Sequence, residues 1–200
     1  MAAGSARGDA GTAARILDIA EQLVQARGFN GFSYADIAAE VGISKAALHY
    51  HFPGKADLGL AVITRYAERF SESLGAIDRA DATPVDRLAA YTRLYGQVLQ
   101  RGKVCLCAVL AAEYQTLPAP MQAAVTGFFE ASEDWLEKVL EEGRQDASLR
   151  FTGTARETAR LVVACLEGAM LVARPCRDSD RVRSVAASLL ADLAGPAGEL

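Results

Sequence analysis

Hydrophobic residues recur at spacings of three and four along most of the chain. In the first such segment they lie on one face of a helix that ends at Arg27, just before Gly28. No segment alternates hydrophobic and polar residues for long enough to predict a strand. The pattern therefore predicts an all-α protein, with helices over about 13–27, 34–41, 45–52, 55–79, 84–101, 103–115, 119–145, 154–174 and 179–194.

Two of the short helices carry clear signals at their ends. Ser33 and Asp36 fit a capping box at the start of 34–41, and Gly42 ends that helix. Ser44 can cap the next helix, which stops before Pro53. A helix followed by two short helices around a glycine turn is the pattern of a helix-turn-helix, whose second helix enters the major groove of DNA.

Composition narrows the class of protein. Of 200 residues, 51% are hydrophobic but only 7% are aromatic, because alanine, the best helix former, carries the apolar share. No apolar stretch approaches the roughly 18 residues of a membrane span, and the N-terminus lacks the pattern of a signal peptide. We therefore expect a cytoplasmic protein with no membrane partner and with four reduced cysteines. A formal net charge of -4 excludes a globally basic nucleic-acid coat but not a local contact surface.

Charge is unevenly placed around the second short helix. No acidic residue lies between Ile43 and Ala56, whereas five hydrogen-bond donors do. Lys55 lies in the first turn of a helix, where a cation is unfavourable by about 0.3–1 kcal/mol, and a bound phosphate would reverse that sign. A solvated lysine at a loop edge is the alternative. Another possible function is that of a helical adaptor that binds a second protein. That function would not explain the absence of acidic residues between Ile43 and Ala56.

The run from Phe32 to Leu58 resembles the DNA-binding segment of TetR-type transcriptional regulators. The resemblance covers residues 10–70, with the motif at 33–52, and departs from the family where His49 replaces the usual tyrosine. It implies a dimeric all-α regulator with an N-terminal three-helix DNA-binding domain and an effector-binding and dimerisation domain over 71–200. Such a regulator is usually a repressor that binds a partly palindromic operator and is released by a small molecule. Residues 1–9 are expected to form a disordered arm.

The resemblance also implies a set of DNA contacts. Ser33 and Lys55 are expected to hold phosphates, whereas Lys45, Ala46 and Tyr50 are expected to meet base edges. The full set is Ser33, Tyr34, Lys45, Ala46, His49, Tyr50, His51 and Lys55. Two histidines at this spacing diverge on a helix and have no third ligand nearby, so we expect neither a metal nor another cofactor.

Cys105 and Cys107 are the other candidates for chemistry. They could serve an all-α thiol enzyme or an electrophile sensor, but this half of the chain has no histidine to act as a base. Helical spacing points the two thiols apart, and free cysteines are commonly buried. We favour inert buried thiols and expect no enzyme, so that serine at both positions should leave induction intact.

The effector site is expected among the helices from 84 to 174. Aromatic side chains at helical spacing with a few polar groups suit such a pocket, although the same pattern is common in cores. Glu113 and Glu167 each lie among apolar neighbours, so one of them could pair with a ligand amine or with an internal arginine such as Arg93 or Arg160. The candidate effector residues are Tyr91, Tyr95, Cys107, Tyr114, Phe128 and Trp135.

The last two predicted helices, 154–174 and 179–194, have long apolar faces. Gly168 and Ala169 offer small residues for the close approach of another helix. Two such helix pairs from two subunits would form a four-helix bundle, which predicts a homodimer through the last two helices.

Overall fold

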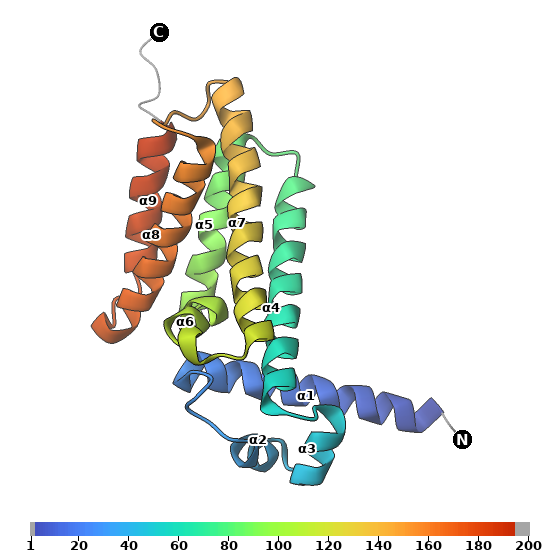
Figure 1. The fold of residues 1–200 in the computed structure, drawn as a ribbon. Coiled ribbons are helices and arrows are strands. Elements are labelled where there is room, and N and C mark those ends of the chain that lie inside the picture. Colours follow the sequence, from blue (N-terminus) through green and yellow to red (C-terminus); the bar gives the residue numbers. More distant parts are fainter. Residues whose placement is uncertain (1–2, 195–200) are drawn as a thin grey trace.

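The computed structural model describes residues 3–194, which form a helical bundle with a small three-helix unit at one end (Figure 1). Residues 3–194 contain no β-strand, so the all-α prediction is confirmed. The elements are α1 (Ala3–Arg27), α2 (Tyr34–Val41), α3 (Lys45–His51), α4 (Lys55–Asp78), α5 (Pro84–Gln100), α6 (Leu106–Ala112), the 3-10 helix η1 (Tyr114–Thr116), α7 (Ala119–Gln145), α8 (Ala155–Cys176) and α9 (Arg181–Ala194).

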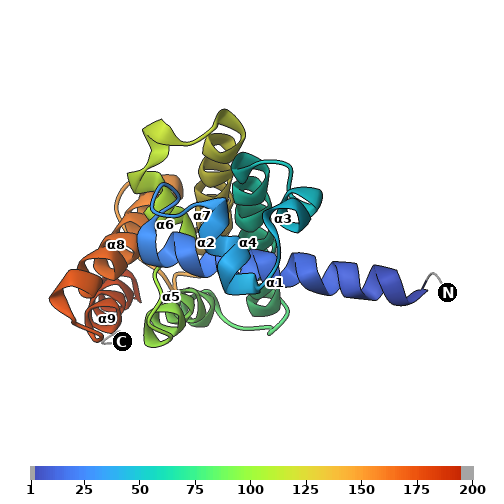
Figure 2. The same ribbon diagram turned by 90° about the horizontal axis from the view of Figure 1, so that it is seen from below.

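The N-terminal unit is built around one face of α1. Ile16 from α1, Ile37 from α2, Leu48 from α3 and Leu58 from α4 are each at most 1% exposed, and they share one hydrophobic cluster. Figures 1 and 2 show α2 and α3 together beyond α1, on the side away from the bundle. The packing therefore presents the short helices at an end of the molecule.

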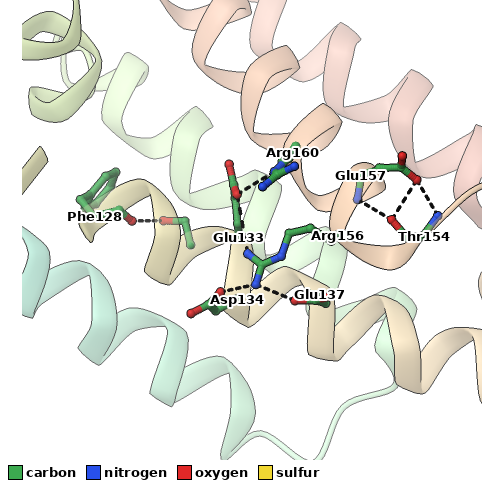
Figure 3. A network of polar contacts seen from close by, with 9 residues as sticks. Phe128, Glu133, Asp134, Glu137, Thr154, Arg156, Glu157 and Arg160 are labelled. Carbon is green, nitrogen blue, oxygen red and sulfur yellow. Dashed lines mark hydrogen bonds and ion pairs between the residues drawn. The ribbon is translucent and has the colours of Figure 1, made fainter. Parts of the chain in front are cut away.

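The C-terminal part is a bundle of long helices. Helices α4, α5, α7, α8 and α9 run beside one another, and α8 packs against both α7 and α9 (Figure 1). On the surface, Arg156 of α8 pairs with Asp134 at 2.5 Å and with Glu137 at 2.7 Å on α7 (Figure 3). Exposed ion pairs contribute about 0–1 kcal/mol each, so the apolar packing between these helices holds the bundle together.

The first helix begins earlier than expected. Helix α1 starts at Ala3, so residues 3–9, which were expected in a disordered arm, belong to it, and residues 1–2 lie outside the described part. Residues 3–9 contain no proline, but they include two glycines beside two alanines, so helix propensity alone does not explain the extension. The prediction of a disordered arm is wrong for residues 3–9.

Two other helix boundaries also differ. Gly102, at φ 69°, ends the preceding helix, and Cys105 is still non-helical, so α6 covers only Leu106–Ala112 instead of 103–115. Pro175 was expected to close its helix but lies inside the last turn of α8, where its missing N–H costs only one hydrogen bond. The helix ends instead at Cys176, and the C-cap residue Arg177 adopts a left-handed φ of 50°.

Candidate DNA interface and effector cavity

Local signals in the sequence form the helix-turn-helix. The Ser33 hydroxyl and the Asp36 carboxylate cap each other's backbone N–H groups, with 2.7 Å between the Ser33 nitrogen and the carboxylate. Gly42 turns the chain at φ 76°, a left-handed conformation that favours glycine. The Ser44 hydroxyl then accepts a hydrogen bond from the Ala47 N–H at 3.1 Å and starts α3. The motif has the expected bounds to within one residue.

Helix α3 turns one face inward and one face outward. Leu48 is fully buried in the core, whereas Tyr50 is 76% exposed. Lys45, Ala46 and His49 are also exposed. Four of the expected DNA contacts therefore lie on the surface of the helix that should enter the groove.

Two of the residues expected to contact DNA also form hydrogen bonds or ring contacts within the protein. The Tyr34 hydroxyl donates to the Phe52 carbonyl at 2.9 Å, and burial raises the pKa of Tyr34 to about 12. The His49 ring lies 4.8 Å from the Tyr34 ring, and its Nδ1 is 2.9 Å from the Pro53 carbonyl. His51 is half-buried. Tyr34 and His49 therefore fix the end of α3, whatever they contact on DNA.

Lys55 is held by the loop between α1 and α2. Its ammonium donates to the carbonyls of Phe29 at 2.6 Å and Phe32 at 2.5 Å, and it lies over both phenylalanine rings. Burial lowers the pKa of Lys55, and the nearby charge of Glu113 partly offsets this. Because two of its three donors serve the loop, a phosphate contact would use the third.

A cavity of about 320 Å³ lies where the N-terminal unit meets the bundle. Two expected effector residues, Tyr95 and Phe128, line it. Sequence reasoning missed Tyr66 and Phe70 of α4, although their four-residue spacing is the same aromatic signal that suggested the others. Further lining residues come from α1, α8 and the loop before α6, and they include Gln25, Cys105 and Met170.

The remaining aromatic candidates have packing roles. The Tyr91 and Tyr95 hydroxyls lie 3.0 Å apart, and the Tyr91 ring stacks on Trp135 at 5.6 Å. The Trp135 indole N–H donates to the Asp78 carboxylate. Trp135 and Phe128 border a second, more open hollow of about 830 Å³ beside α4 and α7. Only part of the expected aromatic set therefore meets at one cavity.

Tyr114 and Cys107 line neither of these two hollows. Tyr114 lies in η1, with its hydroxyl 3.3 Å from that of Thr126. Both Cys105 and Cys107 are buried, and burial raises the pKa of both thiols. A protonated thiol is a poor nucleophile, so this environment favours the interpretation of inert thiols.

Glu113 and Glu167, the two glutamates among apolar neighbours in the sequence, have different surroundings. Glu113 accepts hydrogen bonds from the backbone N–H groups of Phe29 at 2.7 Å and Asn30 at 3.4 Å. Arg160, one of the arginines considered as an internal partner, pairs instead with Glu133 at 3.4 Å (Figure 3). Glu113 therefore serves the loop between α1 and α2, and only Glu167 is left as the candidate for an unpaired buried acid.

Glu167 is 7% exposed, and neither of its carboxylate oxygens has a hydrogen-bond partner. Burial raises its pKa to about 7, while the nearby Cys105 thiol and Tyr95 hydroxyl partly offset that rise. An unpaired carboxyl inside a protein is unusual and calls for a functional explanation.

Among the described residues, no cluster of three or more histidine, cysteine, aspartate or glutamate side chains could hold a metal ion. Within the same residues, none of the helices has the length and apolar character needed to cross a bilayer.

An exposed helix-turn-helix joined to a helical bundle with an internal cavity defines a DNA-binding regulator. A family profile described as bacterial regulatory proteins, tetR family, matches residues 16–62. A second, described as the LmrA/YxaF-like transcriptional regulator C-terminal domain, matches residues 84–188. The chain belongs to the tetR family, and it is a transcriptional regulator, not an enzyme.

Individual relatives agree with this assignment. The chain is 27% identical to the transcriptional repressor NemR of Escherichia coli K12, over 93% of this chain and 96% of NemR. It is 27% identical to the transcriptional regulator LmrA of Bacillus subtilis, over 82% of this chain and 87% of LmrA. The crystal structure of a TetR-family regulator from Agrobacterium tumefaciens is 33% identical, with a TM-score of 0.91 over 94% of this chain and all of that one.

Proposed function

We propose that this regulator is a homodimeric repressor that binds a partly palindromic operator and is released when a small molecule binds its C-terminal domain. The observation that carries the DNA-binding role is the outward face of α3, where Tyr50 is 76% exposed. The similarity to NemR, which is named a repressor, supports the direction of regulation. We place this activity in the cytoplasm, where a bacterial regulator meets its operator.

The DNA contacts divide by position. Lys45, Ala46 and Tyr50, at the exposed face of α3, are proposed to meet base edges in the major groove. Ser33 and Lys55, at helix starts, are proposed to hold phosphates, which fix the register of the protein on the duplex. Tyr34, His49 and His51 complete the proposed set.

The proposed dimer forms through α8 and α9. Large exposed apolar side chains gather on α8, where Leu161 is 57%, Leu171 39% and Val172 45% exposed. A shallow groove beside them is lined by small residues, including Gly168 and Ala169. A twofold axis here would place two α3 helices to enter successive major grooves roughly 34 Å apart.

The cavity is the proposed effector site because it involves both parts of the chain. Gln25 lines it from α1, which forms the core of the DNA-binding unit, while Tyr95 and Phe128 line it from the bundle. A ligand there would favour one arrangement of the two parts, by no more than the difference between its affinities for the two arrangements.

Two exposed lysines offer a matched test of the DNA interface. We expect Lys45→Ala to weaken binding of the full-length dimer to DNA from upstream of its own gene by about tenfold and to lower its preference for that DNA over an unrelated duplex, because a base contact carries specificity. Lys138→Ala, at an exposed position on α7, should change neither quantity. Fluorescence anisotropy with that DNA and with an unrelated duplex gives both values, and equal behaviour of the two variants would overturn the proposed interface.

A further inference from the structure

The effector cavity has a buried oxygen that lacks a hydrogen-bond partner. Gln25 lines the cavity and is 5% exposed. Its amide nitrogen donates to the Val104 carbonyl at 2.8 Å, which fixes the orientation of the amide and leaves the Gln25 Oε1 as an acceptor with no partner. The free atom is thus an acceptor, and it belongs to a wall residue.

Glu167 adds two more unpartnered oxygens beside the same cavity. It precedes the wall residue Met170 by one helical turn. Its carboxyl is close enough to the wall residues Tyr95 and Cys105 for both to affect its pKa. Glu167 therefore lies immediately behind the wall, and all three unpartnered oxygens of Gln25 and Glu167 can only accept hydrogen bonds when the carboxyl is ionised.

The wall is aromatic as well as acceptor-rich. Tyr66, Phe70, Tyr95 and Phe128 line the cavity, and the Phe70 ring lies 5.1 Å from Phe128 and 6.4 Å from Tyr95. Aromatic faces attract cations and pack well against flat organic groups. This combination suits a flat ligand that carries a positive charge.

Two of the three positive side chains that line the cavity are paired or exposed. Arg69 forms an ion pair with Glu21, and both line the cavity. Arg101 and Lys103 lie where α5 ends and the next loop begins, and Arg101 is exposed. Arg69 is thus paired and Arg101 is exposed, which leaves the half-buried Lys103 as the one lining cation that could offset the buried carboxyl.

We infer that the cavity binds a flat organic cation with N–H donors, such as an amidinium or a protonated aromatic amine, whose nitrogen donates to the Gln25 Oε1 and whose charge is balanced by Glu167 behind the wall. The inference rests on the proposal that this cavity is the effector site, and it names the chemical class of the effector. A ligand that offers only acceptors would leave the Gln25 oxygen unsatisfied and the carboxylate charge unbalanced, whereas a cation with N–H donors supplies both a donor and the opposite charge.

A matched pair of probes isolates the effect of the positive charge. Naphthalene-2-carboxamidine and naphthalene-2-carboxamide have nearly the same shape, but only the first is a cation. We expect the full-length dimer to bind the amidine at least about tenfold more tightly than the amide at pH 8, as measured by isothermal titration calorimetry. Equal affinity for the two probes would overturn the inference.

Variants assign this preference to the carboxyl. Glu167→Gln should reduce the preference for the amidine to about twofold or less, with little change in the affinity for the amide. Glu130→Gln, at an exposed position on α7, should keep the full preference. A preference retained by the Glu167 variant would mean that another group selects the cation, and the inference would be wrong.

A second readout uses the wild-type protein, so it does not depend on how the variant folds. The preference should fall between pH 8 and pH 5.5, because protonation of Glu167 removes its charge and one of its acceptors. The titratable groups that face Glu167 are Tyr66, Tyr91, Tyr95, Cys105 and Cys107, and burial raises the pKa of each of them, so they stay neutral across this range. A preference that does not change with pH would contradict the role of Glu167.

Operator binding is measured in parallel to separate the two proposals. Selective binding of the amidine without release of DNA would uphold the inferred ligand class and overturn effector-driven release. Release of DNA by some other compound, with no preference for the amidine, would do the reverse.

Discussion

The Glu113 carboxylate accepts a hydrogen bond from the Phe29 backbone N–H at 2.7 Å and thereby joins the end of α6 to the loop between α1 and α2. The Asn30 side chain adds a bond to Thr116 at 2.8 Å. From the other side, Lys55 holds the Phe29 and Phe32 carbonyls of the same loop. The loop that precedes the helix-turn-helix is therefore fixed by both parts of the chain.

Removal of the Glu113 carboxylate should destabilise this junction. We expect Glu113→Ala to lower the free energy of unfolding by about 1–3 kcal/mol, because the part-buried Phe29 N–H loses a charged acceptor. Urea denaturation measures the change. Glu130→Ala, at an exposed position on α7, should stay within about 0.5 kcal/mol of the wild type.

A double-mutant cycle with Gly28 checks the cause of that loss. Gly28 has φ 78°, and a Cβ there would lie 2.1 Å from the Glu113 Oε1. Gly28→Ala should therefore be destabilising through both backbone strain and this clash. In the Glu113→Ala background only the strain remains, so the cost should be smaller. An equal cost in both backgrounds would show that the two residues are not coupled.

Lys55 should have a structural effect and a DNA-binding effect that can be measured separately. Lys55→Met keeps an apolar stem but removes two charge-assisted bonds to the loop, so we expect a loss of about 2–4 kcal/mol in the free energy of unfolding. If its third donor holds a phosphate, the salt slope of operator binding should also fall by about one. Lys138→Met on α7 is the control, and a stable variant with an unchanged slope would refute both roles.

Much of the fold could be predicted because its signals are local. Ser33, Gly42 and Ser44 act within a few residues of where they stand, and the structure uses each one as a cap or a turn. The core positions Ile37 and Leu48 follow from helical periodicity. Boundaries were predicted less well where tertiary packing decides, as at Cys105, which is buried just before α6 begins.

The sites depend on contacts between distant residues, so the sequence predicted them only in part. The spacing of Tyr95 and Phe128 pointed to the cavity, but it could not separate them from Tyr91, which packs beside them with a bonded hydroxyl. The Lys55 ammonium donates to backbone carbonyls more than twenty positions away in the sequence, and no local sequence pattern indicates such a hydrogen bond. Exposure on α3 was predictable because one face of that short helix is apolar and the other is not.

The cysteines should react in the order of their exposure. Cys105 and Cys107 are buried with raised pKa values, whereas Cys176 is exposed. A disulfide reagent such as DTNB at pH 8 should therefore modify Cys176 rapidly in the native dimer and leave the buried pair unmodified until the protein unfolds. Mass spectrometry of the products identifies the sites. Rapid modification of Cys105 or Cys107 would instead support electrophile sensing.

A charge on the exposed face of α8 should separate the subunits. Leu171 is 39% exposed beside Val172, which is 45% exposed, so both are suited to burial against a second copy. We expect Leu171→Asp to shift the protein from dimer to monomer in analytical ultracentrifugation, because an aspartate cannot be buried there without a partner. Ala123→Asp, at an exposed position on α7, should remain dimeric. Dimers of both variants would place the interface elsewhere.

The raised pKa of Glu167 predicts how stability depends on pH. Its folded-state pKa of about 7 lies above the ordinary value of 4.5, so the native state holds the proton more tightly than the unfolded chain does. The resulting stabilisation is fully present below the unfolded pKa and is lost as pH rises through 7, with a total of about 3 kcal/mol. Glu167→Gln stays neutral at every pH.

The ligand-free Glu167→Gln variant should therefore be more stable than the wild type by about 2–3 kcal/mol at pH 8 and by less than about 1 kcal/mol at pH 5. Urea denaturation at both pH values measures the two differences. All other groups titrate alike in the two proteins, so the change in the difference isolates this one carboxyl, and exposed Glu130→Gln should follow the wild type. A constant difference across the range would mean that Glu167 is ionised in both states and has found a partner in the folded protein.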